Sequence, residues 1–180
     1  NWTEIDSLPD LQPKIASAAS FVKDKIYIFG GYYVDQGGGE ISSDKVHIYN
    51  PSTDSFEPDG APIPTPIDDH VQCVYKDSLI YLVTGWTTSG YVPVVQIYNP
   101  STNSWQSGTS TPNSAFYTAF GASGYIIGDT LYYHGGTAGG GFNAKKFMRK
   151  GYIDPVNPTS ITWELMADAP GDPGYRSACS

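Results

Sequence analysis

The chain has 180 residues, with 18 Asp and Glu residues against 10 Lys and Arg residues, so its formal net charge at pH 7 is −8. So few cations argue against nucleic-acid binding, which depends on clustered positive charge at the phosphates. No run approaches the ~18 consecutive apolar residues of a membrane-spanning helix, so we expect no membrane span.

An apolar run that stops at glycine occurs three times along the chain. The three copies are residues 25–32, 80–86 and 131–137. Their last glycines are 54 residues apart from Gly31 to Gly85 and 51 apart from Gly85 to Gly136. A spacing near 50 residues indicates a repeat architecture.

Each glycine-ended run is one of four strand-like segments in a repeating unit. The segments that precede it are residues 17–22, 71–75 and 117–122. Downstream, residues 46–56 and 95–105 match closely, each with a strand that ends on tyrosine, an Asn-Pro-Ser-Thr turn and an aromatic residue. In the third copy, Tyr152 leads to Trp163 through a turn four residues longer. Turn residues bound every segment, so we expect an all-β chain with no helix longer than a turn or two.

The ordered set of glycine pair, tyrosine and tryptophan resembles the kelch repeat, and the resemblance covers nearly all of the chain. Kelch repeats are the four-stranded blades of β-propellers, so the resemblance implies a kelch-type propeller. The second copy departs from the pattern, because Thr84 stands where the first glycine is expected. Gly85 is then the only freely flexible backbone position at that turn. Trp105 and Trp163 are expected to pack between strands.

Three complete blades are expected, at about residues 14–60, 66–109 and 114–168. A lone fourth strand at 1–9 and a first strand at 171–180 would belong to a closing or further blade. Propellers close with four to eight blades, so the chain is expected to be a partial propeller. It would be completed by missing blades or by self-association, since open sheet edges invite pairing.

The two cysteines, Cys73 and Cys179, fall on first strands of alternate blades. The blade between them should hold their Cα atoms farther apart than the ~7 Å limit for a disulfide, so two buried thiols are expected. The acidic composition, with 20 glycines and 14 tyrosines, fits a secreted protein better than a cytosolic adaptor. We therefore expect an extracellular or periplasmic location.

Long, variable connections are expected on one mouth of the ring, because loops alternate between the two faces of a four-stranded antiparallel blade. These are the connections from second to third strand and from each blade to the next. Binding residues concentrate on such loops. The candidate ligand-binding residues on this mouth are Tyr32, Asp69, His70, Trp86, Tyr117 and Arg176.

Exposed aromatic rings beside a few charged groups suit a peptide or a sugar. The first interpretation is therefore a non-enzymatic binding module for a protein or carbohydrate ligand. The alternative is a sugar-active enzyme of kelch type, similar to the sialic-acid epimerases or to galactose oxidase. Arg176 would then hold a substrate carboxylate, and Asp69 with His70 would supply acid/base chemistry.

No catalytic residue is assigned, because the side chains of adjacent strand residues such as Asp69 and His70 point to opposite faces. The copper centre of galactose oxidase cannot be matched residue by residue to this chain. The sequence has no Cys-x-x-Cys, His-x-x-x-His or phosphate-cradling glycine motif. Neither a metal nor another cofactor is therefore predicted.

Overall fold

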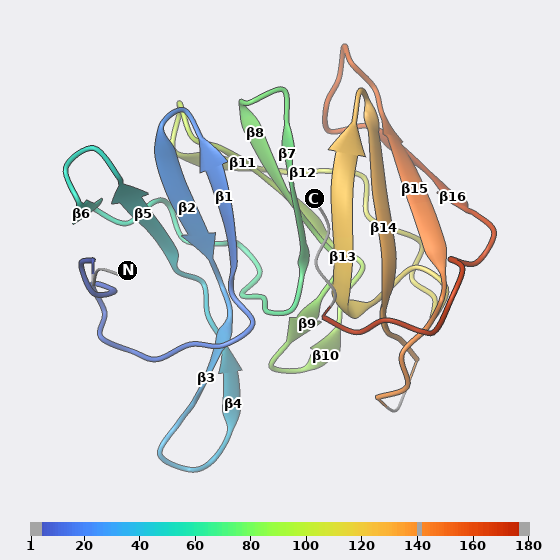
Figure 1. Ribbon diagram of the computed structural model, residues 1–180, viewed down its shortest axis with the longest axis horizontal. Helices are drawn as coiled ribbons and strands as arrows, with labels where there is room; N and C mark the ends of the chain where they lie inside the picture. Colours follow the sequence, from blue (N-terminus) through green and yellow to red (C-terminus); the bar gives the residue numbers. More distant parts are fainter. Residues whose placement is uncertain (1–4, 140–141, 177–180) are drawn as a thin grey trace.

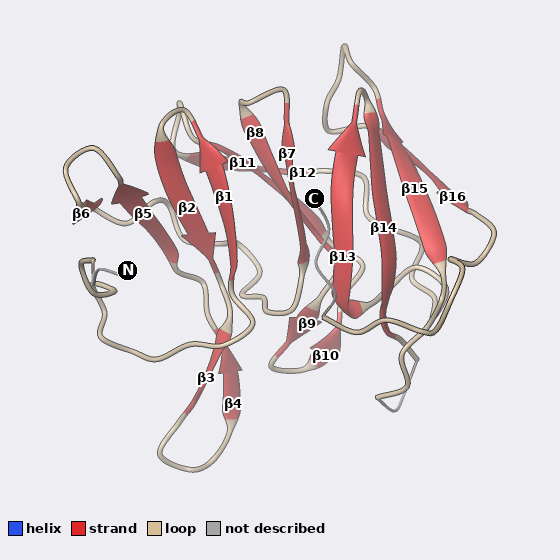
Figure 2. Ribbon diagram, in the orientation of Figure 1, coloured by secondary structure: helices blue, strands red, loops and turns tan. Residues whose placement is uncertain are grey.

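The computed structural model of the protein describes residues 5–139 and 142–176. All regular structure in these residues is β-strand, and they contain no helix, as the sequence predicts (Figure 2). Accordingly, the described ranges offer no helix that could cross a membrane. The fold is all-β.

Three four-stranded antiparallel sheets follow one another along the chain (Figure 1). The first consists of β1 (Ala18–Val22), β2 (Lys25–Phe29), β5 (Val46–Asn50) and β6 (Ser55–Glu57). The second consists of β7 (Val71–Tyr75), β8 (Leu79–Val83), β11 (Val95–Asn99) and β12 (Ser104–Ser107). The third consists of β13 (Phe120–Ile127), β14 (Thr130–Thr137), β15 (Met148–Ile153) and β16 (Ile161–Leu165). Strand β7 lies between β1 and β13, so the first strands of the three sheets face one another.

Two small hairpins are inserted between the second and third strands of the first two sheets. They are β3 (Tyr32–Val34) with β4 (Glu40–Ser42), and β9 (Trp86–Thr87) with β10 (Gly90–Tyr91). In the third sheet the corresponding loop has a bridge between Thr137 and Ala144, and a second bridge joins its Lys145 to Gly174. Figure 1 shows the hairpins on one side of the molecule and the tight turns of β1–β2, β7–β8 and β13–β14 on the other.

The first strand of the third sheet was predicted at residues 117–122, and this prediction is wrong. Strand β13 begins at Phe120 and continues to Ile127. The residues just before β13 form a turn instead, because the carbonyl of Ser114 accepts hydrogen bonds from the backbone N–H of Tyr117 (3.0 Å) and of Thr118 (2.9 Å). The Thr118 hydroxyl donates to the same carbonyl at 3.0 Å.

The apolar core lies in two layers, one between each pair of neighbouring sheets. In the first layer, Phe29 meets the rings of Tyr98 and Trp105 at centroid distances of 5.5 and 5.8 Å. Trp163 packs 6.0 Å from Tyr133 in the other layer. Both indoles also donate to a carbonyl of the preceding inter-sheet linker, Trp105 to Ala61 at 2.8 Å and Trp163 to Thr109 at 3.0 Å. These tryptophans are therefore packing residues, as expected.

A ladder of backbone hydrogen bonds joins the heads of the first strands, and we call it the inner ladder. Its four members, Ala16, Asp69, Gly121 and Arg176, all have left-handed backbones, with φ of 60°, 48°, 65° and 52°. The N–H of Asp69 donates to the carbonyl of Ala16 (3.1 Å), that of Gly121 to Asp69 (2.8 Å) and that of Arg176 to Gly121 (2.7 Å). The ladder therefore ties each sheet to the next at the same height.

Thr84 takes the left-handed conformation of the glycine that it replaces, with φ of 48°. The expectation that Gly85 alone adapts the backbone at this turn is therefore wrong. A β-branched residue at positive φ is unusual, and the Thr84 hydroxyl accounts for it. It donates to the carbonyl of Val92 at 2.9 Å and accepts from the N–H of Ala119 at 2.9 Å, so it anchors the start of the third sheet.

Cys73 is buried on β7, with 4% of its surface exposed. Cys179, the second cysteine that was predicted to be a buried thiol, lies outside the described residues. The same holds for residues 1–4 of the expected lone strand and 177–180 of the expected last strand.

Candidate functional site

A cavity of about 210 Å³ lies where the two hairpins meet the inner ladder. Its walls combine aromatic and charged side chains from the two hairpins, from the start of β13 and from connecting loops. The lining residues are Tyr32, Glu40, Asp68, Asp69, Trp86, Phe120, Phe142, Tyr175 and Arg176. We call this cavity the mouth pocket.

The charged wall of the mouth pocket is built on the pair Asp69 and Arg176. The guanidinium donates from Nε to Oδ1 at 2.7 Å and from Nη2 to Oδ2 at 2.6 Å, a two-pronged pairing. The hydrogen bonds that Arg176 donates to Asp69 raise the pKa of Arg176 further above its usual range. Both residues belong to the inner ladder, so backbone hydrogen bonds hold their main chains in place independently of the ion pair.

Asp68 is the buried carboxylate of this wall, with 2% of its surface exposed. Its backbone pairs with Trp86 in both directions at 2.9 Å, and its Oδ2 accepts a hydrogen bond from the Ser42 hydroxyl at 2.6 Å. Burial, followed by the negative charges of Asp69 and Glu40, raises the pKa of Asp68 to about 6. A carboxyl group with this pKa changes charge close to physiological pH.

The aromatic wall is organised around Phe120, which is 4% exposed. Four rings meet it at 5.2 to 5.6 Å, mostly edge to face, an arrangement that ring quadrupoles favour. They are the rings of Trp86, Tyr91, Phe142 and Tyr175. Trp86 itself is half-buried, so part of its surface remains available in the pocket.

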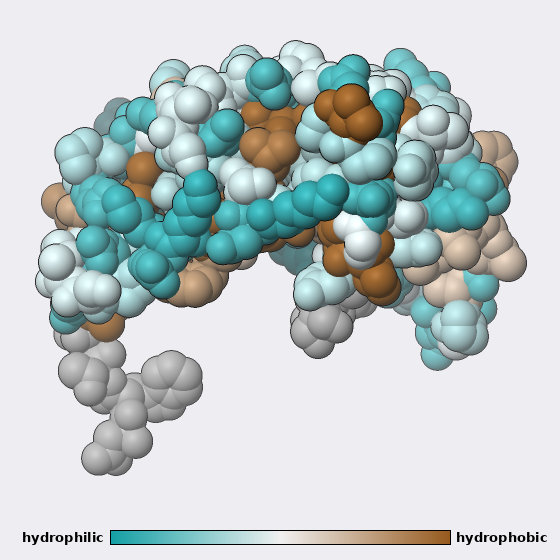
Figure 3. Space-filling view, turned by 90° about the horizontal axis from the view of Figure 1, so that it is seen from above, coloured by the Kyte–Doolittle hydropathy of each residue, from teal (hydrophilic) through white to brown (hydrophobic). Residues whose placement is uncertain are grey.

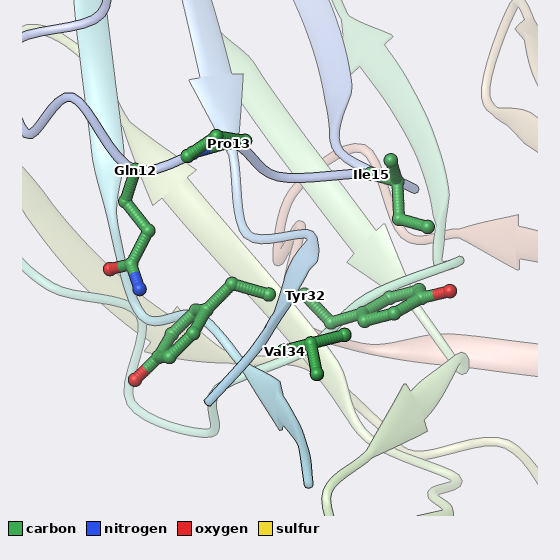
Figure 4. Close-up of a pocket in the computed structure, with 6 residues that line it drawn as sticks. Gln12, Pro13, Ile15, Tyr32 and Val34 are labelled. Atoms are coloured by element: carbon green, nitrogen blue, oxygen red, sulfur yellow. The ribbon is translucent and has the colours of Figure 1, made fainter. Parts of the chain in front are cut away.

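A second cavity of about 330 Å³ adjoins β3 and is mostly apolar. It is lined by Gln12, Pro13, Ile15, Tyr32, Tyr33 and Val34. Figure 4 shows Ile15, Tyr32 and Val34 on one side of this cavity and Gln12 on the other. Because Tyr32 lines both cavities, the apolar cavity and the mouth pocket share a wall.

His70 lies beside the mouth pocket without lining it. It faces a different hollow of about 270 Å³ between the first strands, together with Asp69 and Arg176. Its Nε2 lies 3.1 Å from Oε1 of Gln72, and its buried Nδ1 has no partner among the described residues. Burial lowers the pKa of His70 to about 4, so the ring is neutral at physiological pH. Asp69 and His70 therefore use different partners and do not form an acid/base pair.

The structure brings four of the six candidate residues together in the mouth pocket, namely Tyr32, Asp69, Trp86 and Arg176. His70 lies on the neighbouring hollow. Tyr117 is in the turn before β13, where its carbonyl accepts a hydrogen bond from the Tyr133 hydroxyl at 2.8 Å, and it does not line the mouth pocket.

Five lining residues are not among the six candidates, namely Glu40, Asp68, Phe120, Phe142 and Tyr175. A signal for Phe120 was present in the sequence. Ala16, Asp69 and Gly121 each lie seven residues before the first residue of a tight turn, at Lys23, Lys76 and Gly128 (23 − 16, 76 − 69 and 128 − 121). Counting back from the turn therefore gives the correct phase of the third sheet and places Phe120 at the head of its first strand.

Within residues 5–139 and 142–176, no group of three or more His, Cys, Asp and Glu side chains is arranged to hold a metal ion.

The face with the tight turns lies opposite the hairpins. Figure 3 views the molecule from that side and shows an arched outline with hydrophilic side chains over much of the surface.

Comparisons with known proteins agree with this architecture. A family model described as Kelch motif matches residues 16–62. The Kelch-like protein terF of Aspergillus terreus is 25% identical over 166 residues, which cover 88% of this chain and 35% of that protein. The solved structure of YjhT superposes with a TM-score of 0.80 at 19% identity, covering 97% of this chain and 57% of that chain.

The likeness to YjhT concerns the fold, and it supports the assignment of the three sheets to a propeller. The chain spans about a third of the length of the curated relative that it matches.

Proposed function

We propose that this chain, which is built of kelch repeats and folds as part of a β-propeller, binds a protein partner through the mouth pocket. The observation that carries the proposal is the convergence of rings from both hairpins, from β13 and from two loops with a paired Asp69 and Arg176 on one cavity. Clustered aromatic and arginine side chains in a part-buried pocket are the usual anchors of protein recognition.

The adjoining apolar cavity favours a polypeptide over a sugar. Its lining by Pro13, Ile15 and Val34 suits an aliphatic side chain. A peptide segment can present an apolar and a polar side chain side by side. Two cavities that share Tyr32 match such a segment better than they match a single sugar ring.

The sugar-active enzyme has less support from the geometry. An arginine holds a substrate carboxylate best through a two-pronged pairing, and Arg176 already directs one such edge, Nε with Nη2, at Asp69. His70, the other residue of that alternative, is neutral and faces away from the pocket.

The test is selection of heptapeptides on the immobilised chain, followed by affinity measurement for wild type and Trp86→Ala. Loss of this half-buried ring should weaken the binding of the selected peptides by about 2 kcal/mol or more, as at other interface anchors. Tyr152→Ala is the matched control, because Tyr152 is an aromatic residue on β15 with 51% of its surface exposed, and it does not line the mouth pocket.

Thermal melting of each variant would establish that Trp86→Ala still folds, since Trp86 also packs on Phe120. Peptides that bind wild type and both variants equally would overturn the proposal.

A further inference from the structure

The mouth pocket has more negative than positive charge. Three carboxylates line it, from Glu40, Asp68 and Asp69, against the single guanidinium of Arg176, so its formal charge is −2 when all four groups are ionised (−3 + 1). Asp69 and Arg176 neutralise each other at 2.6 to 2.7 Å. The excess negative charge therefore resides on Asp68 and Glu40.

Glu40 is the accessible member of that pair. It is exposed at the start of β4 and forms no ion pair with any described residue. Asp68 lies deeper, where its Oδ2 is occupied by the Ser42 hydroxyl. A ligand that enters the pocket thus meets an unpaired carboxylate at the rim and a second carboxylate beneath it.

The aromatic wall complements this charge. Ring faces attract cations through their quadrupole, and the attraction grows as water is excluded. The pocket already contains one such contact, because the guanidinium carbon of Arg176 lies 5.0 Å from the centroid of the Tyr175 ring. Trp86, the best ring type for this interaction, lines the same cavity and is half-buried.

We infer that the group taken up by the mouth pocket is a cationic side chain, the ammonium of lysine or the guanidinium of arginine, presented by the protein partner. This inference rests on the proposed function and adds the chemical class of the ligand. Neighbouring negative charges contribute to the raised pKa of Asp68, and a bound cation would relieve that repulsion. An anionic ligand would instead meet Glu40 and Asp68 while Arg176 is already engaged by Asp69.

The direct test uses three small probes of similar shape that differ in charge. They are n-butylammonium, n-butanol and butyrate, titrated into the whole chain while the indole N–H resonance of Trp86 is followed by NMR and assigned with Trp86→Phe. We expect a saturable shift with n-butylammonium, binding about three- to tenfold weaker for n-butanol, and none for butyrate, as a cation contact worth roughly 1 kcal/mol requires.

Glu40→Gln should remove most of the preference for n-butylammonium over n-butanol, and it should also reduce the dependence of binding on salt. Asp24→Asn is the matched control. It changes the total charge by the same amount, but Asp24 lies in the β1–β2 turn on the opposite face, and asparagine tolerates its φ of 63°.

Equal binding of n-butylammonium and n-butanol, stronger binding of butyrate, or no saturable shift with n-butylammonium would each overturn the inference. The peptide selection distinguishes this failure from that of the proposed function. Peptides that depend on Trp86 but contain neither lysine nor arginine would leave protein binding in place and remove only the cationic ligand.

Discussion

Asp69 and Arg176 stand 107 residues apart in the chain and are joined twice. Their side chains form a two-pronged ion pair at 2.6 to 2.7 Å, and their backbones are successive neighbours of Gly121 in the inner ladder. The linker before the second sheet is thus joined to the end of the described chain by side-chain bonds and, through Gly121, by backbone bonds. Substitutions at Asp69 therefore test how far the pocket and the scaffold depend on each other.

Replacement of Asp69 by asparagine should cost about 1 kcal/mol of unfolding free energy. The loss is modest because the Arg176 side chain is 45% exposed, and exposed ion pairs are screened by water. Asp69→Val should cost clearly more, since a β-branched residue is strained at φ of 48°. Urea unfolding of the two variants checks this, and equal stability of the two would show that the backbone conformation at residue 69 contributes nothing.

Asp68 should make the fold less stable as pH rises from about 4 to about 6. Burial raises its pKa from 3.8 to about 6, so in this window the folded chain keeps a proton that the unfolded chain has released. The effect is at most about 3 kcal/mol, because one pKa unit corresponds to about 1.4 kcal/mol. Asp68→Asn should therefore be more stable than wild type near neutral pH and similar to it near pH 4, as measured by urea unfolding across this range.

His70 should have the opposite pH dependence over nearly the same window. Burial lowers its pKa from 6.5 to about 4, so its contribution to stability is complete above the unfolded value and is lost as pH falls toward the folded one. His70→Gln should accordingly gain stability relative to wild type as pH is lowered. The two opposed slopes partly cancel in wild type. If the stability differences between variant and wild type changed with pH in the same direction for Asp68→Asn and His70→Gln, the assignment would be contradicted.

Gly136→Ala should destabilise the fold far more than Gly128→Ala. Both glycines have left-handed backbones, with φ of 73° and 60°. A Cβ at residue 136 would lie 2.7 Å from the Phe120 carbonyl oxygen and 2.9 Å from the Ala122 nitrogen, whereas at residue 128 it would meet open space. We expect a cost of about 1 kcal/mol at residue 128 from backbone strain alone and about 3 kcal/mol or more at residue 136.

Denaturant midpoints of the two glycine variants separate strain from close backbone approach. Equal losses would show that only the sign of φ matters at residue 136.

Thr84→Val should cost about 2 to 4 kcal/mol, because the isosteric change removes the hydroxyl that accepts from the Ala119 N–H inside the core. Thr84→Ser keeps the hydroxyl and loses only the methyl group, so it should remain within about 1 kcal/mol of wild type. Urea unfolding of both variants tests the role of the hydroxyl. A valine variant as stable as the serine variant would assign the unusual backbone of Thr84 to some other cause.

Local patterns predicted most of the fold, because glycine pairs and Asn-Pro turns have short-range consequences. In both Asn-Pro-Ser-Thr turns the asparagine side chain accepts the N–H two residues on, from Ser52 at 3.0 Å and from Ser101 at 2.9 Å. The phase of the third sheet was wrong for a comparable local reason. Phe116 and Tyr117 are strand-forming residue types, but the carbonyl of Ser114 holds them in a turn.

The mouth pocket could be predicted only in part. Tyr32, Trp86 and Asp69 follow from the ends of repeated strands, whose positions the period determines. Glu40 and Phe142 come from loops of unequal length, and their arrival at the pocket depends on contacts between sheets that no short window of sequence contains. Their contribution to the site required the three-dimensional arrangement.

The inner ladder is made only of main-chain atoms, although an alanine, an aspartate, a glycine and an arginine occupy its four positions. The registration of one sheet against the next therefore depends on the left-handed backbone at these positions and not on hydrogen bonds from their side chains. The side chains of Asp69 and Arg176 line the mouth pocket. These two residues therefore align the sheets with their main-chain atoms and contribute to the pocket with their side-chain atoms. A scaffold divided in this way can acquire new specificity around its axis by substitutions that tolerate the left-handed backbone, while the sheets keep their alignment.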